Sequence, residues 1–392
     1  MRKLRPPKLT AKPVRSLEPI LFLAVFLGLF CLIGSKMGAV NMLSTMMNTA
    51  YQLLLDTVFY IMAVAVLAGA LSALFSEFGV ISMINRLLSP LMKPLYGLPG
   101  AASLGIITTF LSDNPAILAL ANDKSFRRYF KMYQLPALTN IGTAFGMGAI
   151  VTTFMIGLNS PSGESFVSAA LIGTLGAFIG SVVSTRIMLR HTAKVYGKDA
   201  PCDPDDDGPE MATGHRAVRE GSLGMRVIDA VMAGGKTGVA LGLDIIPGVL
   251  IICTLVLMLT NGPSDAGVYT GAAYEGVSFF PWLGQKLSFL ITPLFGFTST
   301  EGIAVPITAL GSAGAAIGLV PKLVAAGSAV GRDVAVFTAM CMCWSGYLST
   351  HIAMMNNLKC GKLAGRAIVA HTIGGICAGV AANWLYQLFT FL

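Results

Sequence analysis

Charged residues are scarce in this sequence of 392 residues: they make up 12% of it, whereas 54% of the residues are hydrophobic. Soluble domains carry roughly twice that share of charge. Several apolar runs reach the roughly 20 residues that a helix needs to cross a bilayer, and the mean hydropathy is +0.72. The sequence therefore excludes an ordinary soluble domain and predicts an all-α polytopic membrane protein.

Cysteine patterns that would hold a disulfide framework or a metal are also missing. The seven cysteines are scattered and have no CxxC spacing, so we interpret them as buried small apolar residues. The segment from Gly234 to Thr237 lacks the earlier glycine of a phosphate-binding loop. We recognise no ATP-binding motif and no metal or catalytic cluster. We therefore predict no enzyme activity and no cofactor, and expect any transport to be coupled to Na⁺ or H⁺.

The net charge of +8 does not indicate a nucleic-acid partner, because the basic residues cluster at the ends of apolar runs. Such clusters mark cytoplasmic loops. They predict a cytoplasmic N-terminus, linker (190–226) and loop (357–366), and an outer loop (158–166) and C-terminus. We expect a multi-pass protein of a bacterial inner (plasma) membrane. Its partners are then the lipid bilayer and a small polar substrate, and a homo-oligomer is a further option.

One broken apolar stretch occurs twice. Residues 88–120 (LSPLMKPLYGLPGAASLGIITTFLSDNPAILAL) and 287–319 (LSFLITPLFGFTSTEGIAVPITALGSAGAAIGL) align without a gap. Proline and glycine so close together do not fit a straight spanning helix, so we interpret each stretch as a re-entrant hairpin. We expect the turns, at Gly97–Ala102 and Gly296–Gly302, to approach each other near the middle of the bilayer.

The two halves differ in the charge of their matched loops. The loop at 159–163 has no Lys or Arg, whereas its counterpart near 357–366 is basic. This swap predicts an inverted-topology internal repeat of about seven spans plus two hairpins. The expected divisions are a basic tail (1–17), a first span with its connection (18–49), a first repeat (50–190), a polar linker (191–226) and a second, inverted repeat (227–392).

A family resemblance rests on the PLMxPLYG-type segment from Pro90 to Gly97, which leads into the first broken helix and is echoed in the second half. It resembles the Gate (nucleoside-recognition) domain of spore maturation proteins A and B and of the ferrous iron transporter B family. The plan of hairpins and inverted repeats is similar to that of concentrative nucleoside transporters. In those transporters the hairpin tips carry polar and acidic residues that hold substrate and sodium. Here the second turn matches that character, with Thr298, Ser299, Thr300 and Glu301, whereas Leu98–Ala101 does not.

Polar residues at membrane depth are the other candidates, because a charge at the centre of a spanning helix costs about 2.5–3.5 kcal/mol. Glu301 either binds a substrate or ion or caps the helix that follows it. The segment from Ser112 to Pro115 either contributes oxygens to a site or forms a polar kink. The candidates of the two repeated stretches and of the spans that follow them are Ser112, Asp113, Asn114, Asn140, Ser312, Ser345 and His351.

For His351 a proton or substrate role stands beside that of a hydrogen-bonded interhelical residue. Asp56 and Asp244 occupy similar places near the start of a span in each half. They either cap or pair there, or line an ion path. The function that fits best is secondary transport of a small polar metabolite, nucleoside-like or an organic anion, by alternating access. The alternative is a non-transporting membrane scaffold or assembly factor of the spore-maturation type.

Overall fold

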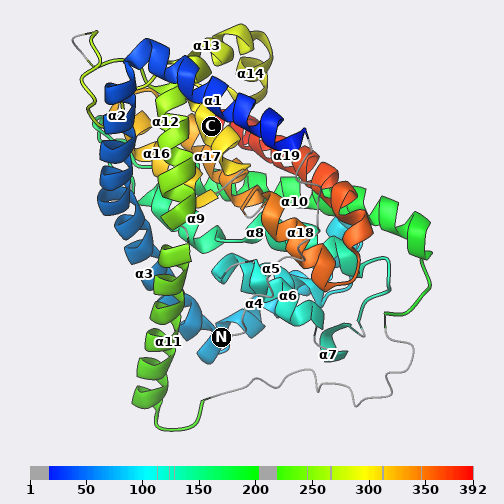
Figure 1. Ribbon diagram of the computed structural model, residues 1–392. Helices are drawn as coiled ribbons and strands as arrows, with labels where there is room; N and C mark the ends of the chain where they lie inside the picture. The colour runs from blue at the N-terminus through cyan, green and yellow to red at the C-terminus, as the bar shows by residue number, and fades with distance from the viewer. Residues whose placement is uncertain are drawn as a thin grey trace.

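The computed structural model describes residues 17–112, 114–122, 124–127, 129–202, 219–244, 246–264, 267–310, 313–345 and 347–391. All the regular elements assigned in these ranges are helices, which confirms the predicted all-α class (Figure 1). Nearly all of the basic tail and the middle of the polar linker lie outside them.

Five described segments are long and apolar enough to cross a membrane. They are α1 (Glu18–Met37); α2 (Ala39–Gln52) with η1 (Leu53–Val58) and α3 (Phe59–Glu77); η2 (Leu135–Ala137) with α8 (Leu138–Phe145) and α9 (Gly148–Ile156); α10 (Val167–Tyr196); and η5 (Gly361–Leu363) with α19 (Ala364–Phe391). The bent pair of α14 (Ser288–Phe295) with η4 (Thr300–Ile303) and α15 (Ala304–Ala309) is apolar enough for a broken span or a re-entrant loop. Its 82° bend confirms the break predicted in the second repeated stretch.

Two further predicted spans are interrupted. One consists of α11 (Leu223–Asp244), the π-helical turn η3 (Gly248–Cys253) and α12 (Thr254–Thr260), and the other of α17 (Gly331–Cys343) and α18 (Tyr347–Asn357). Pro247 precedes η3, and proline cannot supply the backbone hydrogen bond that a continuous helix needs. A matching π-helical turn, η1, interrupts the α2–α3 helix. Sequence reasoning treated these spans as continuous.

The two repeated stretches fold alike around their glycine turns. The first contains α4 (Val80–Tyr96), α5 (Ala102–Leu111) and α6 (Pro115–Asn122), and the second contains α14, η4, α15 and α16 (Ala313–Ala325). Gly97 and Gly296 end α4 and α14 in the left-handed conformation, with φ of 73° and 65°, which glycine adopts without strain. The carbonyls two residues before each glycine are bonded alike: Arg186 Nε donates to Leu95 O (2.7 Å) and Asn383 Nδ2 to Leu294 O (3.1 Å).

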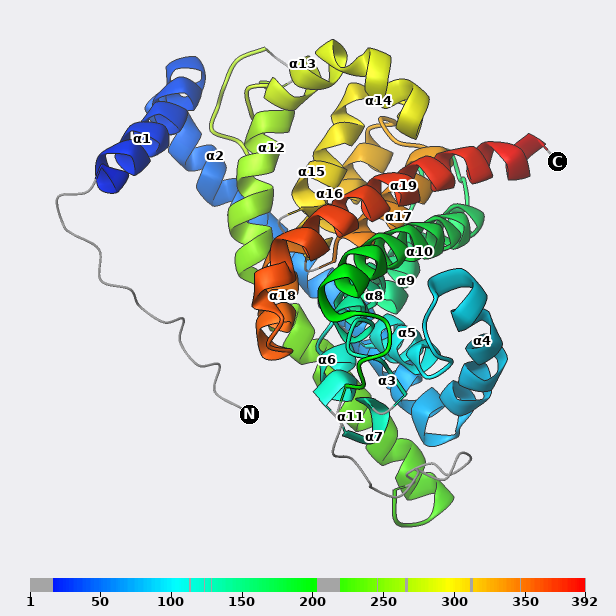
Figure 2. The same ribbon diagram turned by 90° about the vertical axis from the view of Figure 1, so that its right-hand side faces the viewer.

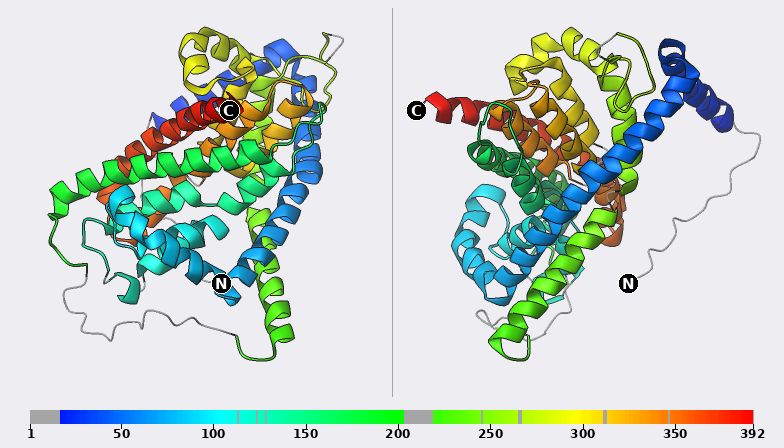
Figure 3. Two further views of the ribbon diagram at one scale, coloured as in Figure 1. Left: turned by 180° about the vertical axis from the view of Figure 1, so that it is seen from behind. Right: turned by 90° about the vertical axis from the view of Figure 1, so that its left-hand side faces the viewer.

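The centre of the molecule is the long helix pair α10 and α19 (Figure 3). The two helices pack closely at Gly176 and Gly180: a Cβ on Gly176 would lie 2.7 Å from Ala378 O, and one on Gly180 2.6 Å from the Cβ of the same alanine. Residues later in α10 contact residues earlier in α19, so the two helices are antiparallel. Glycine lets two helix backbones approach this closely.

This antiparallel pair separates the two glycine turns. The turn at Gly97 lies against Arg186 in the second half of α10, and the turn at Gly296 lies against Asn383 in the second half of α19. The second halves of antiparallel helices point in opposite directions, so the turns lie toward opposite ends of the pair. The expectation that they meet in the middle of the bilayer is therefore wrong.

Outside this centre, α3 and α11 lie side by side along most of their length (Figure 3). We call them the α3–α11 pair. A Cβ on Gly69 would lie 2.5 Å from Gly234 O, so the two backbones touch. Helix α4 lies at the periphery beside α5, on the far side of the molecule from α1 (Figure 2).

Candidate functional site

Two interrupted helices meet through their breaks. Gly146 and Met147 separate α8 from α9, and Ser345 follows the end of α17. Ser345 Oγ donates to Thr143 O (3.2 Å), and Asn114 Nδ2 donates to Ser345 O (3.3 Å). A Cβ on Gly146 would overlap Asn114 Oδ1 and lie 2.6 Å from Ser345 Oγ. Backbone groups released at such breaks can bind polar ligands at membrane depth.

A buried chain of hydrogen bonds runs beside these breaks. Asn140 Nδ2 donates to Ser184 Oγ (2.8 Å), and Ser184 Oγ lies 3.0 Å from Nδ1 of His371, whose Nε2 bonds to Cys343 O. Asn140, Ser184 and His371 have no exposed surface. Because a carbonyl only accepts, His371 carries its proton on Nε2 and accepts from Ser184 on Nδ1. The chain is therefore complete with a neutral imidazole, and it ties α8 and α10 to α17 and α19.

His351 is held in the same way. Its Nδ1 lies 3.1 Å from Tyr347 O and its Nε2 3.3 Å from Thr143 Oγ1, and its ring centroid is 4.7 Å from that of His371. With Nδ1 donating to the carbonyl, Nε2 faces Thr143 Oγ1, whose single proton is directed to Thr139 O (2.6 Å). These contacts join α18 to α8, and a proton or substrate role for His351 stays a prediction.

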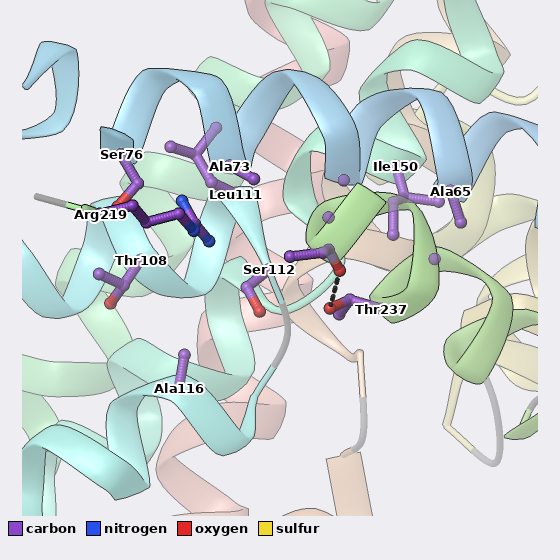
Figure 4. Close-up of a pocket in the computed structure, with 14 residues that line it drawn as sticks. Ala65, Ala73, Ser76, Thr108, Leu111, Ser112, Ala116, Ile150, Arg219 and Thr237 are labelled. Carbon is purple, nitrogen blue, oxygen red and sulfur yellow. Dashed lines mark hydrogen bonds between the residues drawn. The ribbon is translucent and has the colours of Figure 1, made fainter. Parts of the chain in front are cut away.

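A cavity of about 410 Å³ lies between the α3–α11 pair and the elements α5, α6 and α9 (Figure 4). Its α3 wall carries Ala65, Gly69 and Ala73, one turn apart, and its α11 wall carries Gly234 and Gly238. These small residues leave the space open where larger side chains would fill it. Binding sites for small molecules commonly have this volume or more.

The polar groups of this cavity come from α3, α5 and α11 and from the segments that follow α5 and precede α11. They are the hydroxyls of Ser76, Thr108, Ser112 and Thr237 and the guanidinium group of Arg219. Figure 4 shows the guanidinium group pointing into the space between Ser76, Thr108 and Ser112. Ser112 follows α5, next to the segment whose Asn114 reaches the helix breaks. The cavity and the crossing of the broken helices are therefore neighbours.

Arg219 is also part of an ion cluster at the end of α3. Its Nη1 donates to Glu77 Oε2 (2.7 Å), and Arg226 Nε donates to Glu77 Oε1 (2.8 Å). Glu77 is only 4% exposed and ends α3, where the helix dipole disfavours a negative charge. Two arginines from the far end of the linker compensate for that placement.

The second turn lies elsewhere. Asp333, fully buried at the start of α17, accepts from Thr298 N (2.8 Å), Thr298 Oγ1 (2.6 Å) and Val330 N (3.0 Å). Gln134 holds the first turn in the matching way: its Nε2 donates to Gly97 O (3.1 Å) and its Oε1 accepts from Lys131 N (2.9 Å). Thr298 is therefore a structural contact of Asp333.

The rest of the second turn borders a separate cavity of about 220 Å³. Ser299 and Thr300 line it, and Ser299 Oγ is buried without a hydrogen-bond partner among the described residues. Glu301 directly follows Thr300 in η4 and is half-buried. These residues do not line the 410 Å³ cavity.

The predicted site residues thus fall into separate places. Asn114, Asn140, Ser345 and His351 gather around the helix breaks, and Ser112 lines the larger cavity. Asp56 is exposed within η1; Asp244 ends α11, four residues before η3, so the two aspartates do not occupy matching turns. Asp113 and Ser312 lie outside the described residues.

Sequence reasoning missed several participants: Arg219, Glu77, Ser184, Gln134 and Asp333. A signal existed for the last two. Gln134 and Asp333 are separated by the same number of residues as Gly97 and Gly296, so continuing the ungapped alignment would have paired them.

Comparison with solved structures assigns the fold. The chain superposes on CNTnw in an inward-facing substrate-bound state with a TM-score of 0.53, at 14% identity, over 86% of this chain and 80% of that one. A CNTnw variant in an outward-facing state gives the same TM-score and coverage. The chain has the fold of a concentrative nucleoside transporter. It is a multi-pass membrane protein with a transporter-like architecture.

Sequence comparison is less informative. No protein-family model matches the chain. An uncharacterised protein of Alkalihalophilus pseudofirmus is 25% identical over 218 residues, which are 54% of this chain and 45% of that protein. The chain therefore spans about half the length of this curated relative.

Proposed function

We propose that the protein is a secondary transporter that moves a small polar solute across the membrane by alternating access. The observation that carries this proposal is the 410 Å³ cavity between the α3–α11 pair and Ser112, which follows α5. The cavity lies beside the crossing of two broken helices, where backbone carbonyls at the breaks accept hydrogen bonds from polar side chains. Transporters with inverted repeats bind their substrates at such places.

The shared fold supports transport over a scaffold role, because a scaffold needs neither an open polar cavity nor broken helices at membrane depth. The solute is nucleoside-like or an organic anion. We assign ion coupling to Glu301, the acidic residue of the second turn, which is half-buried next to the 220 Å³ cavity. Removing its charge while keeping its shape should uncouple transport from the ion gradient.

Reconstitution into proteoliposomes tests the proposal. Uptake of radiolabelled uridine and succinate is measured with inward Na⁺ gradients, with inward H⁺ gradients and without a gradient. We expect gradient-driven uptake by the wild type. Glu301→Gln should lose the dependence of uptake on the ion gradient, and Asp56→Asn should keep it. If neither solute enters under any gradient although the protein is folded, the result contradicts the transporter proposal and favours the scaffold alternative. If Asp56→Asn abolishes coupling and Glu301→Gln does not, the coupling site has been assigned to the wrong element.

A further inference from the structure

A positively charged side chain lines the larger cavity. Arg219 is the one charged residue among the described residues that line it. Its side chain is 38% exposed, whereas the side chain of its partner Glu77 is 3% exposed. The guanidinium group is thus accessible to a ligand, and the carboxylate that fixes it is not.

The donors of this guanidinium group are only partly used. In the described part of the chain its Nη1 bonds to Glu77 Oε2, and Nε and Nη2 make no further bond. Guanidinium groups bind carboxylate and phosphate groups through paired N–H donors. The hydroxyls of Ser76, Thr108 and Ser112 surround the same space and supply further donors (Figure 4).

The charge of the cluster adds to this preference. Glu77 carries one negative charge between Arg219 and Arg226, so the cluster as a whole has a net charge of about +1. A cavity with low-dielectric walls concentrates such a field on its contents. A neutral solute would gain nothing from it, whereas an anion would.

We infer that the solute of the larger cavity carries an anionic group, a carboxylate or a phosphate, which Arg219 binds while Glu77 and Arg226 hold Arg219 in place. This inference rests on the proposed function, because it takes the ligand of the cavity to be the transported solute. It makes Arg219 the residue that selects for charge. The hydroxyl groups orient the rest of the molecule.

The test uses matched probes on the purified full-length protein. Thermal stability is followed with succinate against succinamide, and with uridine 5′-monophosphate against uridine. At least one anion should raise the melting temperature and its neutral partner should not. Arg219→Gln should weaken the apparent affinity for that anion by about tenfold or more, because a hydrogen bond to a charged group is lost. Arg219→Lys should retain part of the response.

Arg190→Gln is the matched control. It removes an exposed arginine of α10 that neither lines the cavity nor bonds to Glu77, so the anion response should persist. Equal stabilisation by neutral partners, no response to either anion, or an unchanged response in Arg219→Gln overturns the inference. So does loss of the response in Asp113→Asn together with its retention in Arg219→Gln. If uridine is transported regardless of charge, the transporter proposal stands and this inference alone falls.

Discussion

Replacing Gly374 by alanine tests whether α10 and α19 must touch along their backbones. A Cβ at this position would lie 2.6 Å from Gly180 O and 2.6 Å from Ser184 Cβ. Ordinary contacts of a Cβ are about 3.4 Å or longer, so the helices would have to separate by up to about 0.8 Å. The carbonyl belongs to the backbone and cannot rotate away.

Two effects of opposite sign decide the outcome. Alanine is favoured over glycine in a helix by about 1 kcal/mol, whereas overpacking a closely packed interface costs about 1–3 kcal/mol. Ser184 also belongs to the hydrogen-bond chain from Asn140 to His371, which a separation of the helices would stretch. We therefore expect a net destabilisation of about 1–2 kcal/mol.

The assay is the melting temperature of purified protein in one detergent, where this loss corresponds to a fall of roughly 1–3 °C. Gly365→Ala is the control on the same helix, because no atom lies within 4 Å of a Cβ there. That variant should melt at the wild-type temperature or slightly above it. If Gly374→Ala is as stable as Gly365→Ala, backbone contact does not determine the spacing of α10 and α19.

Three further predictions concern the ends of the molecule. Asp333→Asn should destabilise the protein by about 2–4 kcal/mol, because donors of the second turn lose a buried carboxylate; an unchanged melting temperature would contradict this. Burial raises the pKa of Glu275, but hydrogen bonds from Thr270 and Gly271 outweigh it and hold that pKa below its ordinary value of 4.5. Its stabilising effect should therefore be complete above pH 4.5 and be lost as the pH falls below it, so melting temperature should decline less steeply with acid in Glu275→Gln. In a cysteine-free background, an impermeant thiol reagent applied outside should label Ser162→Cys and not Lys362→Cys, both exposed positions; the reverse pattern would refute the predicted orientation.

The class and the two glycine turns were predictable because their causes are local. Apolar content determines the class, and Gly97 and Gly296 end their helices through their own backbone conformation. The position of these turns was not predictable, because it depends on Arg186 and Asn383, which come from helices distant in the sequence. The break at Gly146 was missed because one glycine in an apolar run costs a helix only about 1 kcal/mol.

Arg219 shows a different limit. In the sequence it is one of many basic residues in a polar linker, where it indicates only orientation. It becomes part of a cavity because Glu77, 142 residues away, ends α3 with a charge that needs compensation. A side chain that serves a distant carboxylate and a cavity at once leaves no periodicity or spacing to recognise.

The turns, the breaks and the cavity together suggest how the molecule would move. Gln134 and Asp333 fasten each glycine turn to the next broken helix, and Asn114 fastens the first hairpin to the break of the opposite half. Moving as one body would keep these bonds intact. Tyr60 Oη of α3 donates to Gly157 O, just after α9, at 3.4 Å. The cavity lies at this boundary, so sliding of the body along the α3–α11 pair would change which side of the membrane the cavity faces.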